Sequence, residues 1–416
     1  MVSRRQFMQR MLGLSAAAMV PPAMANALKT APASKTGQAA ATVAVAQSSA
    51  GTEVESLHQI AAASGRMFGS AFDMASINDQ QYGQLLKHHC GILTTDYQFK
   101  FATLRWREES INYYKADQLV AFCQAAGIPI RGHTLIWNEW NPEWLKQAAP
   151  GHVAYWLDRH IEEVVGRYAG KFHSWDVVNE PMWPGHNKEF GLRSGPWFRA
   201  MGPGYIKRAF DVTARTDPTA KRVLNEAWLE RADHWGRGLR AAFLPMLDQL
   251  LEQGTPIDAI GLQCHLAPGN LDMEAFLQLV EQIRQRGLPI YITELDVNDQ
   301  IFADDIAERD QQVAGVYSDF LQEMLQQPGI EIIQTWQLSD KYSFYQGRQE
   351  RQVRVLPFDR EMQAEQRGSG EAGGGSTDVG QPGAAPPATR NVARFPGPAT
   401  RWRHSGPGRR ASAGAS

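Results

Sequence analysis

The chain has 416 residues, with 42 lysines and arginines against 44 aspartates and glutamates, and so a formal net charge of −2. Its three cysteines are too few for a disulfide framework and show no metal-ligand spacing. These figures are typical of a soluble catalytic domain, and they exclude a disulfide scaffold, a membrane bundle and a polyanion-binding protein.

The charge is distributed unevenly along the chain. Residues 1–55 carry a net charge of +3 and residues 367–416 carry +5, so the segment between them carries −10. An acidic body argues against nucleic acid as a partner and is compatible with a neutral substrate.

Residues 1–27 have the features of an export signal: the pair Arg4-Arg5, a short apolar stretch and A-x-A cleavage options around Ala25. The alternative, a buried first helix, is disfavoured by the paired arginines and the alanines. The pair resembles the signal for the twin-arginine export machinery, so we expect an exported protein, periplasmic or secreted, with no membrane contact after cleavage. Residues 28–55, rich in Ala, Ser, Thr and Gln, predict a flexible linker.

Eight short apolar runs follow between residues 65 and 336, and segments with helical periodicity separate them. The predicted strands are Met67–Ala71, Ile92–Thr95, Ile128–Gly132, Ser174–Val178, Arg222–Asn225, Ala259–Gln263, Pro289–Thr293 and Ile332–Trp336. Strand and helix alternating eight times predict a closed parallel (β/α)8 TIM barrel over residues 56–360, with its active site at the C-terminal ends of the strands.

Residues 361–416 form a tail rich in Gly, Pro and Arg. Its last fifty residues contain eleven Gly, six Pro and no Lys, Ile, Leu or Met. They cannot bury enough apolar surface to offset the entropy of ordering them, so we predict a disordered tail. Two origins stay open: a natural solvated or wall-associating tail, or a reading frame that shifts near residue 360.

Polar residues stand at the ends of most predicted strands, and two glutamates among them are the candidate catalytic residues. Glu180 ends the fourth strand and Glu294 the seventh, so they face each other across the barrel mouth. Two carboxyl groups that flank one bond are typical of glycoside hydrolysis. Strand alternation places His265 where it can bridge Glu294 and Asp296. The alternative, that each glutamate is a salt-bridged strand end, explains either one alone but not both together.

These residues lie in four longer motifs: RGHTLIW at 131–137, WDVVNEP at 175–181, GLQCH at 261–265 and ITELDV at 292–297. Together they resemble glycoside hydrolase family 10, the endo-β-1,4-xylanases, in order and approximate spacing. The resemblance implies a retaining mechanism without metal or organic cofactor, in which Glu180 is the general acid/base and Glu294 the nucleophile. Retention implies a separation of about 5–5.5 Å between the two carboxyl groups.

The resemblance also implies contacts with the substrate. Asn179 corresponds to the asparagine that hydrogen-bonds the 2-hydroxyl beside the reacting carbon, and Asp296 is a supporting residue. The other implied sugar contacts, from polar side chains and from tryptophans that wall the site, are Lys100, His133, Trp137, Gln263, His265 and Trp336.

The chain departs from the family at five places, of which Asn138 after Trp137 and Glu226 after Asn225 are single exchanges. Asp96 and Tyr97 stand where the family has Glu-Asn, which alters the expected contacts to the second sugar on the non-reducing side. Phe344 stands where a tryptophan is common. After Asp359 the Gly-rich tail replaces the family's last helix, so we expect a barrel that lacks a regular eighth helix and exposes apolar surface beside its first and last strands.

Three hypotheses follow. The first is retaining, endo-acting hydrolysis of β-1,4-xylosidic linkages, with xylan as the partner. The second keeps the mechanism and changes the substrate to a β-1,4-glucan or an exopolysaccharide. The third is a poorly folding, non-catalytic sugar-binding product that lacks the last barrel helix.

Overall fold

The computed structural model describes residues 55–362. The predicted export signal at 1–27, linker at 28–55 and tail at 361–416 lie outside this range, except for the residues at its two edges. Within it, no helix is both long enough and apolar enough to cross a bilayer.

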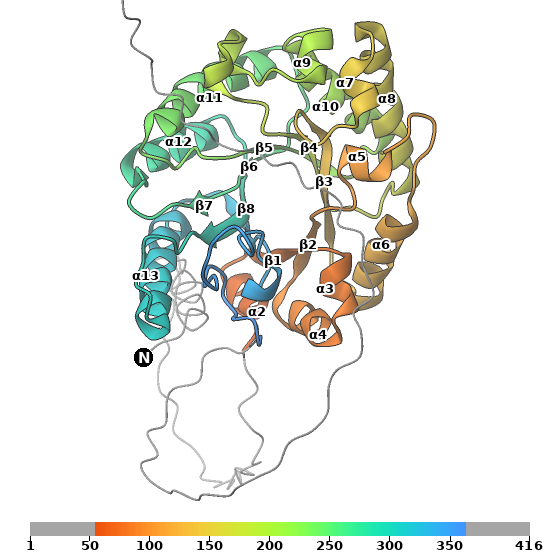
Figure 1. Cartoon of the computed structure of the whole chain (residues 1–416). Coiled ribbons are helices and arrows are strands. Elements are labelled where there is room, and N and C mark those ends of the chain that lie inside the picture. The colour runs from red at the N-terminus through yellow and green to blue at the C-terminus, as the bar shows by residue number, and fades with distance from the viewer. Residues whose placement is uncertain (1–54, 363–416) are drawn as a thin grey trace, which may run out of the picture. The chain divides into compact units, whose positions relative to one another are not determined.

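Parallel strands form the centre of the described structure. They are β1 Met67–Phe72, β2 Ile92–Thr95, β3 Ile130–Trp137, β4 Ser174–Asn179, β5 Lys221–Glu226, β6 Ala259–Leu262, β7 His265–Leu266, β8 Ile290–Val297 and β9 Ile330–Thr335. Strand β1 pairs with both β2 and β9, which closes the sheet into a barrel. The short strands β6 and β7 both pair with β8 and together occupy one of eight positions. The predicted (β/α)8 barrel is therefore confirmed (Figure 1).

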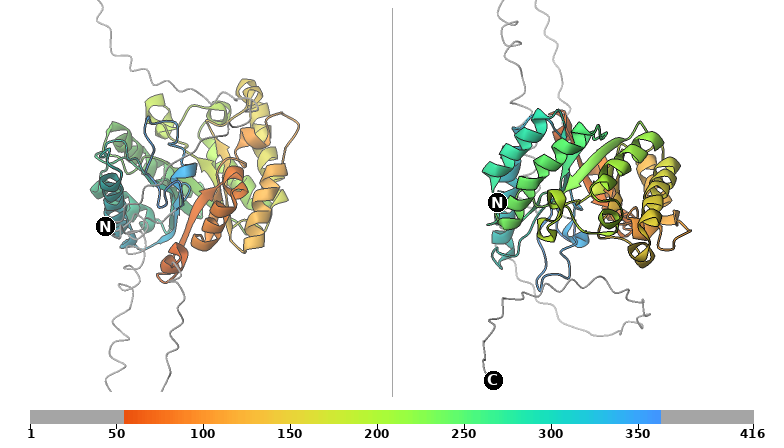
Figure 2. Two further views of the ribbon diagram at one scale, coloured as in Figure 1. Left: turned by 60° about the horizontal axis from the view of Figure 1, so that its bottom comes forward. Right: turned by 90° about the horizontal axis from the view of Figure 1, so that it is seen from above.

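Helices surround the strands on the outside (Figure 2). The α-helices are α2 Leu57–Ala62, α3 Met74–Asn78, α4 Gln80–His89, α5 Phe101–Leu104, α6 Tyr114–Ala126, α7 Glu143–Gln147, α8 Pro150–Arg167, α9 Pro196–Met201, α10 Gly204–Thr216, α11 His234–Glu252, α12 Met273–Gln285 and α13 Ile306–Leu325. The 3-10 turns are η1 Pro184–His186, η2 Glu189–Gly191 and η3 Asp340–Tyr342. Up to Met362, η3 is the only helical turn after β9, and the position of the predicted missing helix lies beyond the described residues.

The helices bury one apolar face against the barrel. In α12 the buried residues are Phe276, Leu279, Val280 and Ile283, spaced three or four apart. This spacing places them on one side of a helix with 3.6 residues per turn. The side chain of Asp272 caps the start of α12 by accepting from the backbone N–H of Ala275.

The barrel interior has an apolar layer and a polar layer. The apolar layer comes from five strands and consists of Ile92, Val223, Ala259, Tyr291 and Ile332. In the polar layer Arg131 is completely buried and forms an ion pair with Asp176. Its guanidinium also donates to Ser174 Oγ at 3.0 Å and to Gln334 Oε1 at 2.6 Å. Because other strands of the barrel supply these partners, the buried guanidinium is hydrogen-bonded without solvent.

Two strands extend four or five residues beyond their predicted ends. Strand β3 was expected to end at Gly132 but continues to Trp137, and β8 continues past Thr293 to Val297. Polar residues suggested the earlier ends. In β3, however, His133 N–H donates to a threonine of β2 at 3.0 Å and the Thr134 hydroxyl to a carbonyl of β4 at 2.8 Å, so these groups are satisfied inside the sheet.

The predicted exposure of apolar residues on the first and last strands is not found among the described residues. In β1 only Met67 is half-buried, and the apolar side chains of β9 are buried. Phe68 and Ile333 both pack into the main hydrophobic core, which explains why these strands show little apolar surface.

Candidate active site

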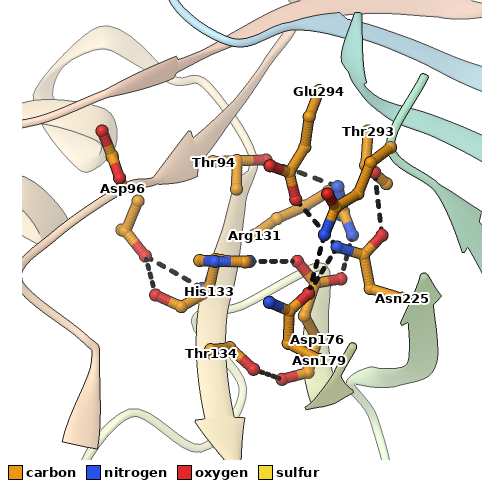
Figure 3. Close-up of polar contacts among 12 residues, drawn as sticks. Thr94, Asp96, Arg131, His133, Thr134, Asp176, Asn179, Asn225, Thr293 and Glu294 are labelled. Carbon is orange, nitrogen blue, oxygen red and sulfur yellow. Dashed lines mark hydrogen bonds and ion pairs between the residues drawn. The ribbon is translucent and has the colours of Figure 1, made fainter. Parts of the chain in front are cut away.

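Glu294 lies in β8 at the C-terminal end of the barrel and is 4% exposed. Its Oε1 accepts a hydrogen bond from Asn225 Nδ2 at 2.8 Å (Figure 3). Its Oε2 lies 3.2 Å from His265 Nε2. Both oxygens of this carboxylate therefore have a nitrogen partner.

His265 joins Glu294 to Asp296, as predicted. Its Nδ1 lies 2.8 Å from Asp296 Oδ2, on the side of the ring opposite the contact with Glu294. Burial by itself would lower the pKa of His265, but the charges of Asp296 and Glu294 together raise it well above its usual range. The imidazole is therefore a cation held between two carboxylates.

Glu180 follows β4 and is more open than Glu294, since its side chain is 18% exposed. Its backbone has a φ of 45°, in the left-handed region that is uncommon for residues other than glycine. Side-chain oxygens of Glu180 accept from Gln263 Nε2 at 3.2 Å and Trp137 Nε1 at 3.3 Å, and pair with Arg193 Nη2 at 3.0 Å. Backbone strain at a residue that carries a partly exposed carboxylate is typical of a functional site.

A network of amide side chains connects the two glutamates. Asn179 Oδ1 accepts from Asn225 Nδ2 at 2.8 Å and from Gln263 Nε2 at 3.2 Å. Because Asn225 also donates to Glu294 and Gln263 also donates to Glu180, the network fixes both carboxylates relative to Asn179. Figure 3 shows Asn225 between Asn179 and Glu294.

Asn225 was noticed in the sequence only as a polar strand end, yet it contacts Glu294 directly. A neighbouring glycine gives it room: a Cβ on Gly261 would lie 2.2 Å from Asn225 Oδ1. The hydroxyl of Thr293 donates to the same oxygen at 2.8 Å and fixes the orientation of the amide. A glycine in the strand beside a polar strand end is therefore a signal that could have identified Asn225.

Lys100 lies beside a cluster of three aromatic side chains, Trp137, Trp140 and Tyr97. Its Nζ is 3.1 Å from Asp96 Oδ1, and 5.5 and 5.6 Å from the ring centres of Trp137 and Trp140. The two indoles are nearly parallel, with an interplanar angle of 9°. Tyr97 meets Trp140 edge-on at 5.5 Å and is 42% exposed. Trp137 thus begins an aromatic surface that extends away from Glu180 through Trp140 to Tyr97.

His133 and Trp336 form a second contact pair of the predicted site. His133 Nδ1 lies 3.0 Å from Asp176 Oδ2, and its ring meets that of Trp336 edge-on at 5.1 Å. The backbone N–H of Trp336 donates to the carbonyl of Leu295, the residue after Glu294, at 3.4 Å. The pair is therefore tied to the strand that carries Glu294.

Arg193 was missed by the sequence analysis. It lies 13 residues after Glu180, between η2 and α9, and it pairs with both Glu180 and Glu139. No strand or helix pattern marks this segment, so a lone arginine there gave no signal.

Two further carboxyl groups are buried near this end of the barrel. Burial raises the pKa of Glu226 to about 8 and that of Glu230 to about 7. Glu226 accepts from the backbone N–H groups of Met182 and Ala227 at 3.1 and 2.9 Å. At neutral pH Glu226 is therefore mostly protonated and lacks the negative charge that a carboxylate nucleophile requires.

Residues 55–362 contain no group of three or more His, Cys, Asp or Glu side chains arranged to hold a metal ion. The chemistry available from the described side chains is that of two carboxylates, an imidazolium and amide donors. Carboxylates at the ends of two barrel strands can act as a general acid and a nucleophile.

Comparison with known proteins gives consistent results. The family model "Glycosyl hydrolase family 10" matches residues 56–367. Endo-1,4-beta-xylanase B of Thermotoga neapolitana is 29% identical over 283 residues, which are 67% of this chain and 79% of that protein. Endo-1,4-beta-xylanase 3 of Hypocrea jecorina is 30% identical over 293 residues, covering 70% of this chain and 78% of the relative.

Solved structures show the same similarity. Xylanase 10B from Thermotoga petrophila RKU-1, crystallised with xylobiose, superposes with a TM-score of 0.69 at 27% identity. The match covers 76% of this chain and 95% of that one. Native xylanase 10B from Thermotoga maritima gives a TM-score of 0.68 at 28% identity, over 74% and 94% of the two chains.

Proposed function

Because the chain belongs to glycosyl hydrolase family 10, we propose that it hydrolyses internal β-1,4-xylosidic linkages of xylan with retention of configuration. One observation carries the proposal: Glu180 and Glu294 lie at the C-terminal ends of β4 and β8 and are connected through Asn179, Asn225 and Gln263. The enzyme is thus an endo-1,4-β-xylanase whose chemistry depends on two glutamates.

The environments of the two glutamates suggest their roles. Glu294, buried between Asn225 and the His265 cation, is the carboxylate that attacks the anomeric carbon. Glu180, which is more exposed, gives its proton to the departing oxygen and then takes a proton from the water that cleaves the glycosyl ester. His265 and Asp296 support the negative charge on Glu294 before the attack.

The remaining predicted residues bind the sugars. Asn179 lies in the amide network beside both glutamates, where its side chain can meet the 2-hydroxyl of the reacting sugar. Trp137 and Trp336 offer ring surfaces for the sugar faces, and Trp137 contacts Glu180 directly. The polar contacts proposed for the substrate are Lys100, His133, Gln263 and His265.

The test is hydrolysis of xylan followed by the release of reducing ends, with wild type compared with Glu294→Ala. Loss of the nucleophile should lower the rate by at least about a thousandfold. Glu162→Ala, on an exposed site of α8, is the matched control and should retain the wild-type rate. Unchanged activity of the Glu294 variant would refute the assignment, and an α-configured first product would refute retention.

A second candidate substrate is favoured by the aromatic surface around Tyr97. Where the family has Glu-Asn, the chain has Asp96, paired with Lys100, and Tyr97, in contact with Trp140. An aromatic platform selects less strictly by hydroxyl pattern than polar groups do, so a β-1,4-glucan is the alternative.

We expect the double variant Asp96→Glu, Tyr97→Asn to raise the preference for an aryl β-xylobioside over an aryl β-cellobioside by about tenfold, because polar contacts to the second sugar return. The measurement is the ratio of kcat/KM for the two substrates. The control substrate is an aryl β-xyloside, which lacks the second sugar. The double variant and the wild type should hydrolyse it with the same kcat/KM. A ratio that stays at the wild-type value would exclude Tyr97 as a determinant.

We also propose export of the enzyme to the periplasm or medium by the twin-arginine machinery. The support is the sequence alone: Arg4-Arg5, the apolar stretch and the alanines around Ala25. Replacing both arginines by lysine should trap the uncleaved protein in the cytoplasm, which immunoblotting of cell fractions would detect. Continued export of that variant would refute this route.

A further inference from the structure

Arg193 is held firmly beside Glu180 although it lies in an irregular segment. It is 7% exposed, and its backbone N–H donates to the carbonyl of Pro181 at 2.7 Å. The guanidinium carbon lies 4.8 Å from the ring centre of Trp183. Backbone anchoring and a cation–π contact together leave the guanidinium little freedom to leave the site.

This guanidinium is shared between two carboxylates. Its Nη2 lies 3.0 Å from Glu180 Oε2, and its Nη1 pairs with Glu139 Oε1. The side chain of Glu139 is 54% exposed, against 18% for Glu180. Burial raises the pKa of Glu139, while the charge of Arg193 lowers it. When Glu180 is protonated, Glu139 remains as a partner for the cation, and when Glu180 is ionised the two carboxylates compete for it.

The other titratable groups around Arg193 are neutral near pH 7. Burial raises the pKa of Glu226, at the end of β5, to about 8, and raises that of Tyr205, on α10, above its usual range. Burial and the charge of Arg193 lower the pKa of His186 in η1. Beyond the amide network lie the charges of Glu294 and His265. On the near side, the charge balance therefore depends on Arg193, Glu139 and Glu180.

We propose that Arg193 is a positioning residue whose guanidinium, shared between Glu139 and Glu180, assists Glu180 in giving up its proton. The inference rests on the function proposed above. As the glycosidic C–O bond breaks, the leaving oxygen takes the proton of Glu180, and Arg193 stabilises the carboxylate that remains. When water then attacks the glycosyl ester, Glu180 takes a proton from that water and becomes neutral. Arg193 is then paired with the charge of Glu139 alone.

Two substitutions test the inference, one that removes the positive charge of Arg193 and one that removes the negative charge of Glu139. The measurement is the pH dependence of kcat/KM on an alkyl β-xylobioside. Its alkaline limb reports loss of the proton that the general acid must carry. Arg193→Gln should move this limb to higher pH by about one unit, because the ionised form of Glu180 loses its cation. Glu139→Gln should move it to lower pH by about half a unit, because Arg193 then serves Glu180 alone.

A dinitrophenyl β-xylobioside has a leaving group that needs little protonation. It therefore distinguishes a loss of general acid catalysis from a general loss of activity. Arg193→Gln should lower kcat/KM at least about tenfold more on the alkyl than on the dinitrophenyl substrate. Arg193→Lys keeps the charge and should restore much of the wild-type limb.

The inference would be overturned if the alkaline limbs of both variants coincide with that of the wild type, or if both limbs move in the same direction. If Arg193→Gln does not fold, the direction of the Glu139→Gln shift, at an exposed site, decides alone. A wild-type protein inactive on both xylobiosides would refute the proposed function instead, which keeps the two failures distinct.

Discussion

Asp296 is hydrogen-bonded to Glu294 through a histidine. The carboxylate of Asp296 is buried at the far side of His265, and the two are 2.8 Å apart. Because that contact and the charge of Glu294 keep the imidazole cationic, Asp296 controls how strongly His265 supports the attacking carboxylate. A residue without a direct contact to Glu294 thereby influences the charge on it.

Asp296→Asn should therefore weaken catalysis without removing a reacting group. Loss of one charge-assisted hydrogen bond, about 2 kcal/mol, corresponds to a roughly 30-fold lower kcat/KM. The measurement is kcat/KM on an aryl β-xylobioside between pH 4 and pH 8.

Asp319→Asn, at an exposed position of α13, is the matched control for this substitution. It should leave both the rate and the pH profile unchanged. An unchanged kcat/KM in Asp296→Asn would show that Asp296 does not act on the reaction through His265.

Among single residues, the sequence predicted those that stand in strand-end motifs. His265 between Glu294 and Asp296 follows from alternation along two neighbouring strands, and the structure confirms that contact. Arg193 could not be predicted in this way, because it reaches Glu180 from an irregular segment whose path depends on tertiary packing. Residue roles are thus easiest to predict where a regular element fixes the direction of the side chain.

At the scale of elements, the two strands that carry His133 and Asn179 touch through a glycine. A Cβ on Gly132 of β3 would lie 2.0 Å from a ring carbon of Trp175 in β4. The indole of Trp175 has no room to move away, because it is completely buried and its ring centre lies 4.1 Å from that of Phe172, on which it stacks. The close approach of β3 and β4 therefore depends on the absence of a side chain at residue 132.

Gly132→Ala should destabilise the fold by about 3 kcal/mol through overpacking of the buried indole. The measurement is the urea midpoint of unfolding, followed by both tryptophan fluorescence and circular dichroism. Activity should fall as well, since the displaced strands carry site residues.

Gly315→Ala is the matched control for the same exchange in a helix. A Cβ there would meet no atom within 4 Å. Alanine should stabilise α13 by about 0.5–1 kcal/mol, because it loses less backbone entropy on folding. Equal stability of the two variants would contradict the packing argument at Gly132.

The ends of the elements were harder to predict than the elements themselves. Apolar runs identified all eight barrel positions, but His133 and Thr134 suggested that β3 ends early. Their polar groups are bonded to neighbouring strands, which a single strand's sequence does not reveal. At Cys264 the reverse occurs: β6 ends at Leu262, one residue before the predicted end, and after the turn at Cys264, whose φ is 60°, the unpredicted strand β7 follows.

For the whole molecule, the alternation of strands and helices was sufficient to predict the barrel, because eight strands in parallel register close on themselves. The export signal and the Gly-rich tail stay predictions, since both depend on composition rather than on contacts. The buried acids could not be predicted either, because the sequence does not state how much solvent reaches Glu226 and Glu230.

These buried acids make the stability of the whole fold depend on pH. Burial raises the pKa of Glu226 from its ordinary 4.5 to about 8 and that of Glu230 to about 7. Between these limits the folded state holds protons that the unfolded state has released, so the free energy of unfolding falls as the pH rises. The charged partners of His265 act with the same sign, since the stability they provide is lost as the pH rises from the ordinary pKa of 6.5 through the raised pKa of the folded state.

Glu226→Gln should therefore lose less stability than wild type between pH 5 and pH 8, by about 3 kcal/mol, because the amide cannot ionise. Urea unfolding at both pH values, followed by two probes whose transitions coincide, measures the difference. Glu162→Gln, at an exposed site on α8, should keep the wild-type dependence. Parallel pH dependences of wild type and Glu226→Gln would mean that Glu226 is already ionised in the folded barrel, and that the two backbone donors at Met182 and Ala227 outweigh its burial.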